Sequence, residues 1–182
     1  MWVERPSLDY FVVLSAFVPY KRLDLAVEAA NRLRVPLKIV GSGSGQRELE
    51  RMAGPTVEFV KPGGQGAVRE LLANARALLF PGEEDFGITP VEANACGRPV
   101  VAYRAGGACE SMVDGETAVF FDSQTVGDLI DAMHRVQRLD VDPARLRLNA
   151  LRFAMPRFRS QIAAFLRSHV GSSVSGLARG EG

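Results

Sequence analysis

Short apolar runs alternate with helical patterns along most of the chain. Six runs have the length and the β-branched or aromatic content of buried strands, and they occupy residues 10–15, 36–41, 57–60, 77–81, 99–103 and 118–121. Segments with apolar residues three or four positions apart lie between these runs, at residues 21–33, 46–53, 66–75 and 90–96. Strands that alternate with helices predict an α/β fold, here a six-stranded parallel sheet with helices on both faces.

The pattern becomes helical after the sixth apolar run. Its spacing predicts helices over residues 125–139, 142–154 and 158–170, which gives the fold a helical C-terminal end. A length of 182 residues suits one domain, which we place at residues 1–170. Residues 171–182, GSSVSGLARGEG, have no core-forming pattern and are expected to form a disordered tail.

Composition places the chain among soluble globular proteins, with 47% hydrophobic and 24% charged residues. No apolar run approaches the roughly 20 residues of a membrane-spanning helix. The first residues, MWVERPSLDY, lack the basic and then apolar regions of a signal peptide. Cys96 and Cys109 form no CxxC motif and are expected to be buried thiols rather than a disulfide. A cytoplasmic location is therefore expected.

Charge is balanced overall but uneven along the chain. The net charge of +1 argues against a general nucleic-acid-binding protein. Residues 83–131 hold 10 acidic and 2 basic residues, whereas residues 132–182 hold 9 basic and 3 acidic residues. Two interpretations of the basic segment stay open: a solvated helix face, or a docking surface for a partner or an anionic membrane.

The unusual sequences all lie in the loops that follow the predicted strands. Right-handed crossovers place these loops at one edge of a parallel sheet, where ligands usually bind. The loops are Ser15–Lys21, Gly41–Gly45, Lys61–Gly66, Pro81–Thr89 and Ala105–Glu110. In the last of these, a pair of glycines indicates a close approach by some other group. We therefore expect a ligand crevice along this edge.

The glycine-rich stretch GSGSG, at residues 41–45, does not match a dinucleotide-binding fingerprint. The GxGxxG pattern needs glycine at position 46, which is Gln46, and the stretch follows the second predicted strand rather than the first. No GxxxxGK[ST] motif occurs in the chain. A flexible turn and a phosphate-contacting loop remain alternatives here.

The stretch GEEDFGITPVE, at residues 82–92, gathers four carboxylates around one turn. Thr89, followed by Pro90 and then by Glu92, predicts a capping box at the start of a helix. The same helix start leaves the backbone amides of Gly87, Ile88 and Thr89 open to an anion. Glu92 therefore has two interpretations, a helix cap or a ligand-binding carboxylate.

Carboxylates and an anion site belong together only if the carboxylates contact other groups. Carboxylates accept hydrogen bonds from sugar hydroxyls, so a ligand that is both a diphosphate and a polyol would satisfy both halves of the loop. Lys21 could supply the positive charge, although a solvated lysine at a helix start is an equal alternative. His134 and His169 lie on late predicted helices, and no HExxH or Cys/His cluster indicates a metal site.

Four stretches together resemble a known enzyme family. They are EEDFGITPVEANACGRPVVA with Glu84 and Glu92 as an E-x7-E pair, AFVPYKRLDLAVEA, VGSGSG and AGGACESMVDGETAVFF. In this order they resemble the carboxy-terminal, donor-binding domain of family 4 retaining glycosyltransferases, which have the GT-B fold, and the resemblance covers nearly all of residues 8–170. The phrases VPYKR and FPGEEDFGI are most similar to GDP-mannose-dependent mannosyltransferases of bacterial surface polysaccharide synthesis.

The resemblance implies a Rossmann-like domain that binds a nucleotide sugar and passes its hexosyl group, expected to be mannosyl, to a glycan or lipid-linked acceptor. It implies that Glu84 accepts hydrogen bonds from donor-sugar hydroxyls and that Lys21 neutralises the leaving diphosphate. Glu92 would hold the ribose hydroxyls. The full donor-binding set that it implies is Ser15, Gly43, Val60, Lys61, Phe86, Gly87, Ile88, Thr89 and Glu92. No metal or other cofactor is implied.

The chain departs from the family pattern in two ways. Ala16 stands where many members carry an arginine, which removes one cation from the diphosphate site. Family members also have an amino-terminal Rossmann-like domain for the acceptor, so we expect that domain to be supplied in cis or in trans and the isolated chain to transfer poorly. The apolar stripe Phe158, Ile162, Phe165 and Leu166 would brace it.

The resemblance also allows peripheral association of the full enzyme with the inner face of the membrane. The alternative function is a non-catalytic nucleotide-sugar-binding or assembly module of the same fold. A dinucleotide-dependent oxidoreductase is disfavoured by the failed GxGxxG match and by the absence of a suitable acidic residue after the first strand.

Overall fold

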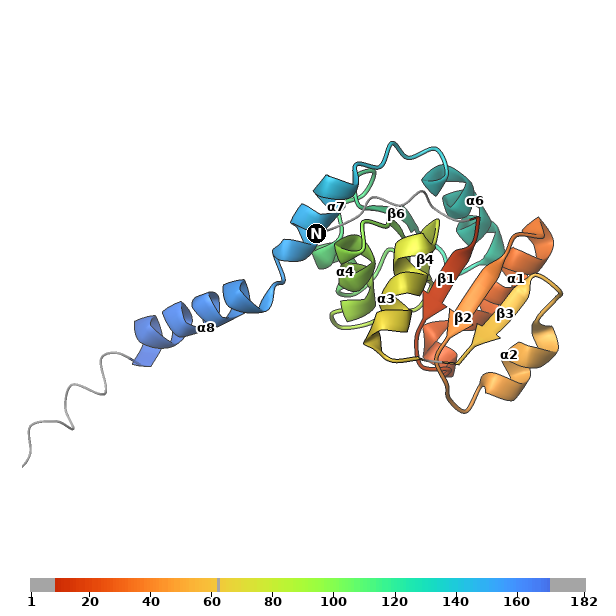
Figure 1. Ribbon diagram of the computed structural model, residues 1–182, viewed down its shortest axis with the longest axis horizontal. Coiled ribbons are helices and arrows are strands. Elements are labelled where there is room, and N and C mark those ends of the chain that lie inside the picture. Colours follow the sequence, from red (N-terminus) through yellow and green to blue (C-terminus); the bar gives the residue numbers. More distant parts are fainter. Residues whose placement is uncertain (1–8, 62, 171–182) are drawn as a thin grey trace, which may run out of the picture. The chain divides into compact units, whose positions relative to one another are not determined.

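A six-stranded parallel sheet forms the centre of the fold (Figure 1). The computed structural model describes residues 9–61 and 63–170. The strands are β1 (Phe11–Leu14), β2 (Leu37–Val40), β3 (Val57–Val60), β4 (Ala77–Phe80), β5 (Val100–Tyr103) and β6 (Ala118–Phe121). Their order is β3-β2-β1-β4-β5-β6, and every pair is parallel. All six predicted strands are therefore confirmed.

Helices follow the strands as the apolar spacing predicts. They are α1 (Leu23–Leu33), α2 (Gln46–Met52), α3 (Gln65–Asn74), α4 (Ile88–Ala95), α5 (Ala108–Ser111), α6 (Val126–Val136), α7 (Pro143–Leu151) and α8 (Met155–Val170). A 3-10 turn, η1 (Pro19–Lys21), precedes α1. Neither η1 nor α5 was predicted, because segments this short carry no visible helical period.

Alternate strand residues point to opposite faces of the sheet and build two cores. Phe11 and Val13 belong to the core that is completed by α1, α2 and α6. Val12 belongs to the core that is completed by α3, α4 and α5. Both faces are therefore covered, which explains why the strands are apolar runs rather than alternating patterns. The predicted Rossmann-like α/β arrangement is confirmed.

The start of α4 differs from the predicted capping box. The helix begins at Ile88, and Gly87 precedes it with a φ of 73° and no side-chain cap. Thr89 and Glu92 therefore lie inside the helix, and the capping-box prediction is wrong. Gly87 adopts a left-handed backbone conformation, which glycine tolerates easily. The helix therefore begins directly after Gly87, before the start that a cap at Thr89 would give. The cap occurs instead at α6, where Thr125 Oγ1 accepts a hydrogen bond from the Asp128 N–H at 3.2 Å.

A buried pair of amide side chains fastens α7 to α4. Asn149 donates hydrogen bonds to Asn94 Oδ1 at 2.9 Å and to the carbonyl oxygen of Ser111 at 2.8 Å. Asn94 donates in turn to the carbonyl oxygens of Arg98 at 3.0 Å and Thr117 at 3.3 Å. Buried polar groups are stable only when they are hydrogen-bonded, so this network gives α4 a single position.

The chain divides into two compact units, residues 1–150 and residues 151–182. The first contains the sheet and the helices as far as α7, and the second contains α8. The single domain at residues 1–170 stays a prediction, and the tail at residues 171–182 lies outside the described residues. Among the described residues, no helix combines the length and the apolar character needed to cross a bilayer.

Both cysteines are free thiols, as expected. The expectation that both are buried is wrong, because Cys96 is half-buried and Cys109 is exposed. Cys109 lies in α5, a one-turn helix whose inward positions are taken by Ala108 and Ser111.

Candidate functional site

The strand order reverses between β1 and β4, so the loops after these two strands lie side by side at the carboxyl edge of the sheet. The loop after β1 leads into η1, and the loop after β4 occupies residues 81–87. In doubly wound sheets this reversal leaves a crevice that binds ligands. The described residues of all five unusual loops follow the carboxyl ends of parallel strands and so lie on this edge, as predicted.

A cavity of about 540 Å³ opens between these two loops. The residues that line it are Tyr20, Lys21, Glu83, Glu84, Asp85, Phe86, Gly87 and Ile88. Its volume falls within the range of pockets that hold small ligands. The fold thus brings Lys21 together with Glu84 and with the predicted residues 86–88.

Lys21 and Glu84 form an ion pair at this cavity. The Lys21 side chain is only 11% exposed and that of Glu84 is 26% exposed. The Lys21 ammonium also lies over the Tyr20 ring, 4.7 Å from the ring centroid, which is a cation–π contact. Water screens such a partly buried pair less than an exposed one. The cation and the carboxylate of the predicted site are therefore held against each other.

Glycines bring the backbones around the cavity into close contact. A Cβ atom at Gly82 would lie 2.6 Å from Lys21 Cα. A Cβ atom at Gly106 would lie 2.3 Å from the carbonyl oxygen of Glu84, to which the Gly107 N–H donates a hydrogen bond at 2.8 Å. The glycine pair after β5 therefore approaches the backbone of the acidic loop. This contact sets the position from which Glu84 reaches Lys21.

The glycine-rich stretch after β2 packs against the loop after β1. Gly43 has a φ of 155°, and a Cβ atom there would lie 2.5 Å from the carbonyl oxygen of Phe17. The Phe17 N–H donates to the carbonyl oxygen of Ser42 at 2.8 Å, and the Gly45 N–H donates to that of Phe17 at 2.9 Å. Close backbone packing is thus sufficient to explain these glycines, without flexibility or a phosphate contact.

The other predicted site residues lie near the same edge but outside the cavity wall. Ser15 follows β1, Val60 ends β3 and Lys61 is exposed directly after it. Thr89 and Glu92 are the second and the fifth residues of α4. Gly43 likewise stands apart from the residues described as lining the cavity.

Glu92 has a perturbed carboxyl group. Desolvation by the surrounding protein raises its pKa above the usual value, because a carboxylate loses hydration there. Its side chain is nevertheless exposed by surface area, so solvent moderates the effect. Perturbed carboxyl groups occur often at functional sites, and the helix-cap interpretation no longer competes for this residue.

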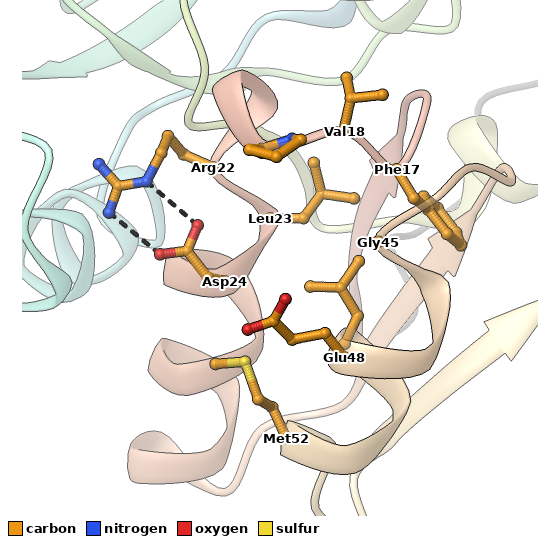
Figure 2. Close-up of a pocket in the computed structure, with 10 residues that line it drawn as sticks. Phe17, Val18, Arg22, Leu23, Asp24, Gly45, Glu48 and Met52 are labelled. Carbon is orange, nitrogen blue, oxygen red and sulfur yellow. Dashed lines mark hydrogen bonds and ion pairs between the residues drawn. The ribbon is translucent and has the colours of Figure 1, made fainter.

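A second cavity, of about 360 Å³, lies between η1, the start of α1 and α2 (Figure 2). Its lining residues are Phe17, Val18, Pro19, Arg22, Leu23, Asp24, Gly45, Glu48, Leu49 and Met52. Arg22 donates two hydrogen bonds to Asp24, at 3.1 and 3.0 Å, so the cation in this wall is matched by a carboxylate from the same helix start. No residue of the loop after β4 lines this cavity. We therefore place the candidate site at Lys21 and Glu84.

A metal centre has no candidate ligand set in the part of the chain that the structure describes. No group of three or more His, Cys, Asp or Glu side chains is arranged there to hold a metal ion. His134 and His169 lie in α6 and α8 and are exposed.

Comparison with known proteins connects this geometry to a family. The model of the family described as "Glycosyl transferases group 1" matches residues 3–152. The chain belongs to this family. The match includes every strand of the sheet, Lys21 and the whole acidic loop after β4.

Curated relatives of this group 1 chain transfer sugars. It is 37% identical over 160 residues to the GDP-mannose-dependent alpha-(1-6)-phosphatidylinositol monomannoside mannosyltransferase of Mycolicibacterium smegmatis, which covers 78% of the chain and 40% of that protein. It is 34% identical over 116 residues to the D-inositol 3-phosphate glycosyltransferase of Actinosynnema mirum, with 58% of the chain and 28% of that protein covered. The chain thus spans less than half the length of these relatives.

Solved structures with the same fold include Anabaena HepE in complex with UDP and glucose. The TM-score is 0.77 at 23% sequence identity, and the match covers 87% of the chain and 48% of HepE. A glycosyltransferase from Rickettsia africae gives a TM-score of 0.79 at 15% identity, with 90% and 48% covered. At such identities the likeness establishes the fold of this group 1 domain.

Sequence reasoning missed Tyr20 and the supporting role of Gly82. A lone tyrosine in a short loop belongs to no periodic pattern, although the phrase VPYKR contained it. Tyr20 is 63% exposed at the cavity, and Phe86 and Ile88 are also exposed there. Exposed apolar groups that gather at one place are a signal of binding that only the folded arrangement reveals.

Proposed function

We propose that this chain is the nucleotide-sugar-binding half of a retaining glycosyltransferase that transfers a hexosyl group, expected to be mannosyl, to a glycan or lipid-linked acceptor. The observation that carries the proposal is the position of Lys21 and Glu84, which meet in one cavity at the reversal of the strand order. A cation for diphosphate and a carboxylate for hydroxyls are the two groups that a nucleotide sugar needs.

In this proposal each residue has one task. The carboxylate of Glu84 accepts hydrogen bonds from the donor sugar, and the amides at the start of α4, near Gly87 and Ile88, meet the sugar and the diphosphate. As the bond from the anomeric carbon to the phosphate oxygen breaks, the electron pair stays on the diphosphate, whose charge Lys21 neutralises. The acceptor hydroxyl oxygen then bonds to the anomeric carbon on the same face, and its proton passes to the diphosphate oxygen that has left. Glu92 holds the ribose, with Val60 and Lys61 beside the base.

The family and its relatives support the class of donor. The M. smegmatis relative is named as GDP-mannose-dependent, which favours a mannosyl donor. HepE was solved with UDP-glucose as well as with UDP, so this fold accommodates nucleotide sugars. A metal-independent reaction is part of the proposal.

The acceptor is proposed to bind a second domain, supplied by a longer chain or by a partner. The relatives are more than twice as long as their matched segments. The helix α8 presents a row of exposed apolar side chains, at Met155, Phe158, Ile162, Phe165 and Leu166. An exposed apolar face of this kind is suited to pack against another domain.

We also propose that the full enzyme works in the cytoplasm at the inner face of the membrane. The M. smegmatis relative acts, by its name, on a phosphatidylinositol monomannoside, which is a lipid. The helix α8 contains Arg157, Arg159 and Arg167 and no acidic residue, which suits an anionic surface. Sedimentation with vesicles that contain anionic lipid tests this proposal, and neutral vesicles serve as its control.

Calorimetric titration with GDP-mannose, UDP-glucose and NADH, each with and without EDTA, tests the function. We expect GDP-mannose to bind selectively and EDTA to leave its affinity unchanged. Binding of NADH alone would contradict the proposal. In the intact enzyme, Glu84→Ala is expected to abolish transfer, and unchanged transfer would remove the role assigned to Glu84. Intact donor binding without transfer by any assembled form would favour the alternative, a non-catalytic binding module.

A further inference from the structure

We propose that Lys21 and Glu84 form a latch, which the diphosphate of the donor opens and which closes again when the sugar has left. In the structure, the cation for the diphosphate and the carboxylate for the sugar are paired with each other. The pair uses Glu84 Oε1 and part of the positive charge of the Lys21 ammonium, so each group contacts the donor at full strength only after the pair separates. This inference rests on the proposed function. It adds that binding of the diphosphate by Lys21 and binding of the sugar by Glu84 depend on each other.

Both backbones of the latch are held in place, so its opening is an exchange of side-chain partners. The backbone of Lys21 packs against Gly82 so closely that a Cβ atom at Gly82 would lie 2.6 Å from Lys21 Cα. The backbone of Glu84 is held by its carbonyl oxygen, which accepts a 2.8 Å hydrogen bond from the Gly107 N–H. The Tyr20 ring supports the ammonium, 4.7 Å from its centroid. The flexible lysine stem is the part that can move between Glu84 and a phosphate.

A diphosphate competes with Glu84 for this ammonium. Among the residues that line the cavity, Lys21 is the one with a cationic side chain, whereas Glu83, Glu84 and Asp85 are acidic. A bound diphosphate brings more negative charge than one carboxylate, so it takes Lys21 and leaves Glu84 without its cation. Sugar hydroxyls can then satisfy Glu84, because an ionised carboxylate is an acceptor only.

The latch therefore favours the complete donor over its product. A nucleoside diphosphate without sugar must separate the pair and leave the Glu84 carboxylate beside phosphate charge, with no hydroxyl to compensate. After transfer, Glu84 can reclaim Lys21 as the sugar leaves, which weakens the hold on the diphosphate. Release of the product is thus coupled to loss of the sugar from the site.

Titration with inorganic pyrophosphate, GDP and GDP-mannose tests the latch on three forms of the whole chain. Glu84→Gln removes the competing carboxylate, and Glu83→Gln is the matched control, since it removes the same charge from the adjacent position of the same cavity wall. We expect Glu84→Gln to bind pyrophosphate about threefold to tenfold more tightly than the wild type, and Glu83→Gln less than about twofold. The preference for GDP-mannose over GDP should disappear in Glu84→Gln alone.

Equal or weaker pyrophosphate binding by Glu84→Gln, relative to Glu83→Gln, would overturn the latch. Failure of every form to bind pyrophosphate would overturn it too. Tighter pyrophosphate binding by Glu84→Gln without any binding of GDP-mannose would support the latch and contradict the proposed donor. Selective binding of GDP-mannose, together with equal pyrophosphate affinities of Glu84→Gln and Glu83→Gln, would support the proposed donor and overturn the latch.

A measurement on the wild-type chain keeps the test independent of how Glu84→Gln folds. The chain has three lysines, Lys21, Lys38 and Lys61, so selectively labelled lysine side chains give a readily assigned NMR spectrum. Lys38 serves as an internal control, because it pairs with Glu58 at 3.3 Å on β2 and β3. We expect pyrophosphate to shift the Lys21 signal and to leave Lys38 unchanged. An unchanged Lys21 signal at saturating pyrophosphate would overturn the latch.

Discussion

The backbone N–H of Gly107 donates a hydrogen bond to the carbonyl oxygen of Glu84 at 2.8 Å. This bond joins the segment after β5 to the acidic loop after β4, two parts of the chain that the sequence keeps well apart. It matters for function because the Glu84 carboxylate reaches Lys21 from a backbone that this contact supports. The candidate site thus depends on residues that take no part in the proposed chemistry.

Gly107→Ala is expected to displace the acidic loop. A Cβ atom there would lie 2.4 Å from Phe86 Cα, a backbone atom that cannot rotate away. We expect a loss of about 1–3 kcal/mol in the free energy of unfolding, measured with urea, together with weaker donor binding. Gly66→Ala is the control, because nothing lies within 4 Å of its Cβ position in α3. It should be neutral or stabilising by up to about 1 kcal/mol, and equal stabilities of the two variants would contradict the close contact.

Thr89→Ala and Thr125→Ala should differ in stability, although both threonines lie at helix starts. Thr125 caps α6 and accepts a hydrogen bond from the Asp128 N–H, so its loss is expected to cost about 1 kcal/mol. Thr89 lies inside α4 and makes no cap, so its loss should cost less than about 0.5 kcal/mol. Chemical denaturation of both variants checks this, and an equal loss at Thr89 would restore the capping box.

The stability of the Glu92→Gln variant, relative to the wild type, should increase as the pH rises. Desolvation raises the pKa of Glu92 in the folded state above its usual value of 4.5, so ionisation above that pH penalises the folded protein. The amide avoids this penalty. We expect Glu92→Gln to melt slightly higher than the wild type near neutral pH, and the difference to vanish below pH 4.5. A difference that grows as the pH falls would mean that the carboxylate is stabilised rather than desolvated.

Glu92→Gln should weaken nucleotide binding, although it is expected to stabilise the fold near neutral pH. If its carboxylate holds the ribose, loss of the charged acceptor weakens GDP binding by about tenfold. Calorimetry near neutral pH checks this, and unchanged affinity would remove Glu92 from the proposed site.

Asn149→Ala is expected to cost about 1–3 kcal/mol, because it leaves Asn94 Oδ1 and the carbonyl oxygen of Ser111 buried without this donor. Leu148→Ala, on the same helix, is the control, because that side chain is 64% exposed and should cost less than about 0.5 kcal/mol. In a double-mutant cycle with Asn94→Ala, the two losses should not add. Additive losses would mean that the amides act independently.

A chain that ends after residue 153 tests whether α8 belongs to the core. Residues 1–150 form a compact unit, so we expect this shortened chain to unfold with the same midpoint as the full chain. Removal of the apolar row that includes Phe158 and Phe165 should also reduce self-association at high concentration, measured by analytical ultracentrifugation. Loss of folding would instead support the single domain at residues 1–170.

Much of the fold was predictable from the sequence because strands and helices have different apolar periods. The six strands were found because a doubly covered parallel sheet requires continuous apolar runs. Helix starts were less predictable. The pattern of Thr89 and Glu92 satisfied the rule for a capping box, yet Gly87 could adopt a backbone conformation that moved the start. Local rules of this kind compete, and tertiary packing selects among them.

The sequence by itself determined the fold class and the edge of the sheet at which the unusual loops lie, whereas the resemblance to a family suggested Lys21 and Glu84 as site residues. The apolar period and the position of a loop after a strand are local properties, so they can be read from the sequence without knowledge of how the elements pack. Only the tertiary structure decided that Lys21 and Glu84 meet as an ion pair, that Gly82 packs against the backbone of Lys21, and that the glycine pair after β5 packs against the backbone of Glu84. Such contacts join residues far apart in the chain, and their distances depend on how strands are ordered and loops are packed.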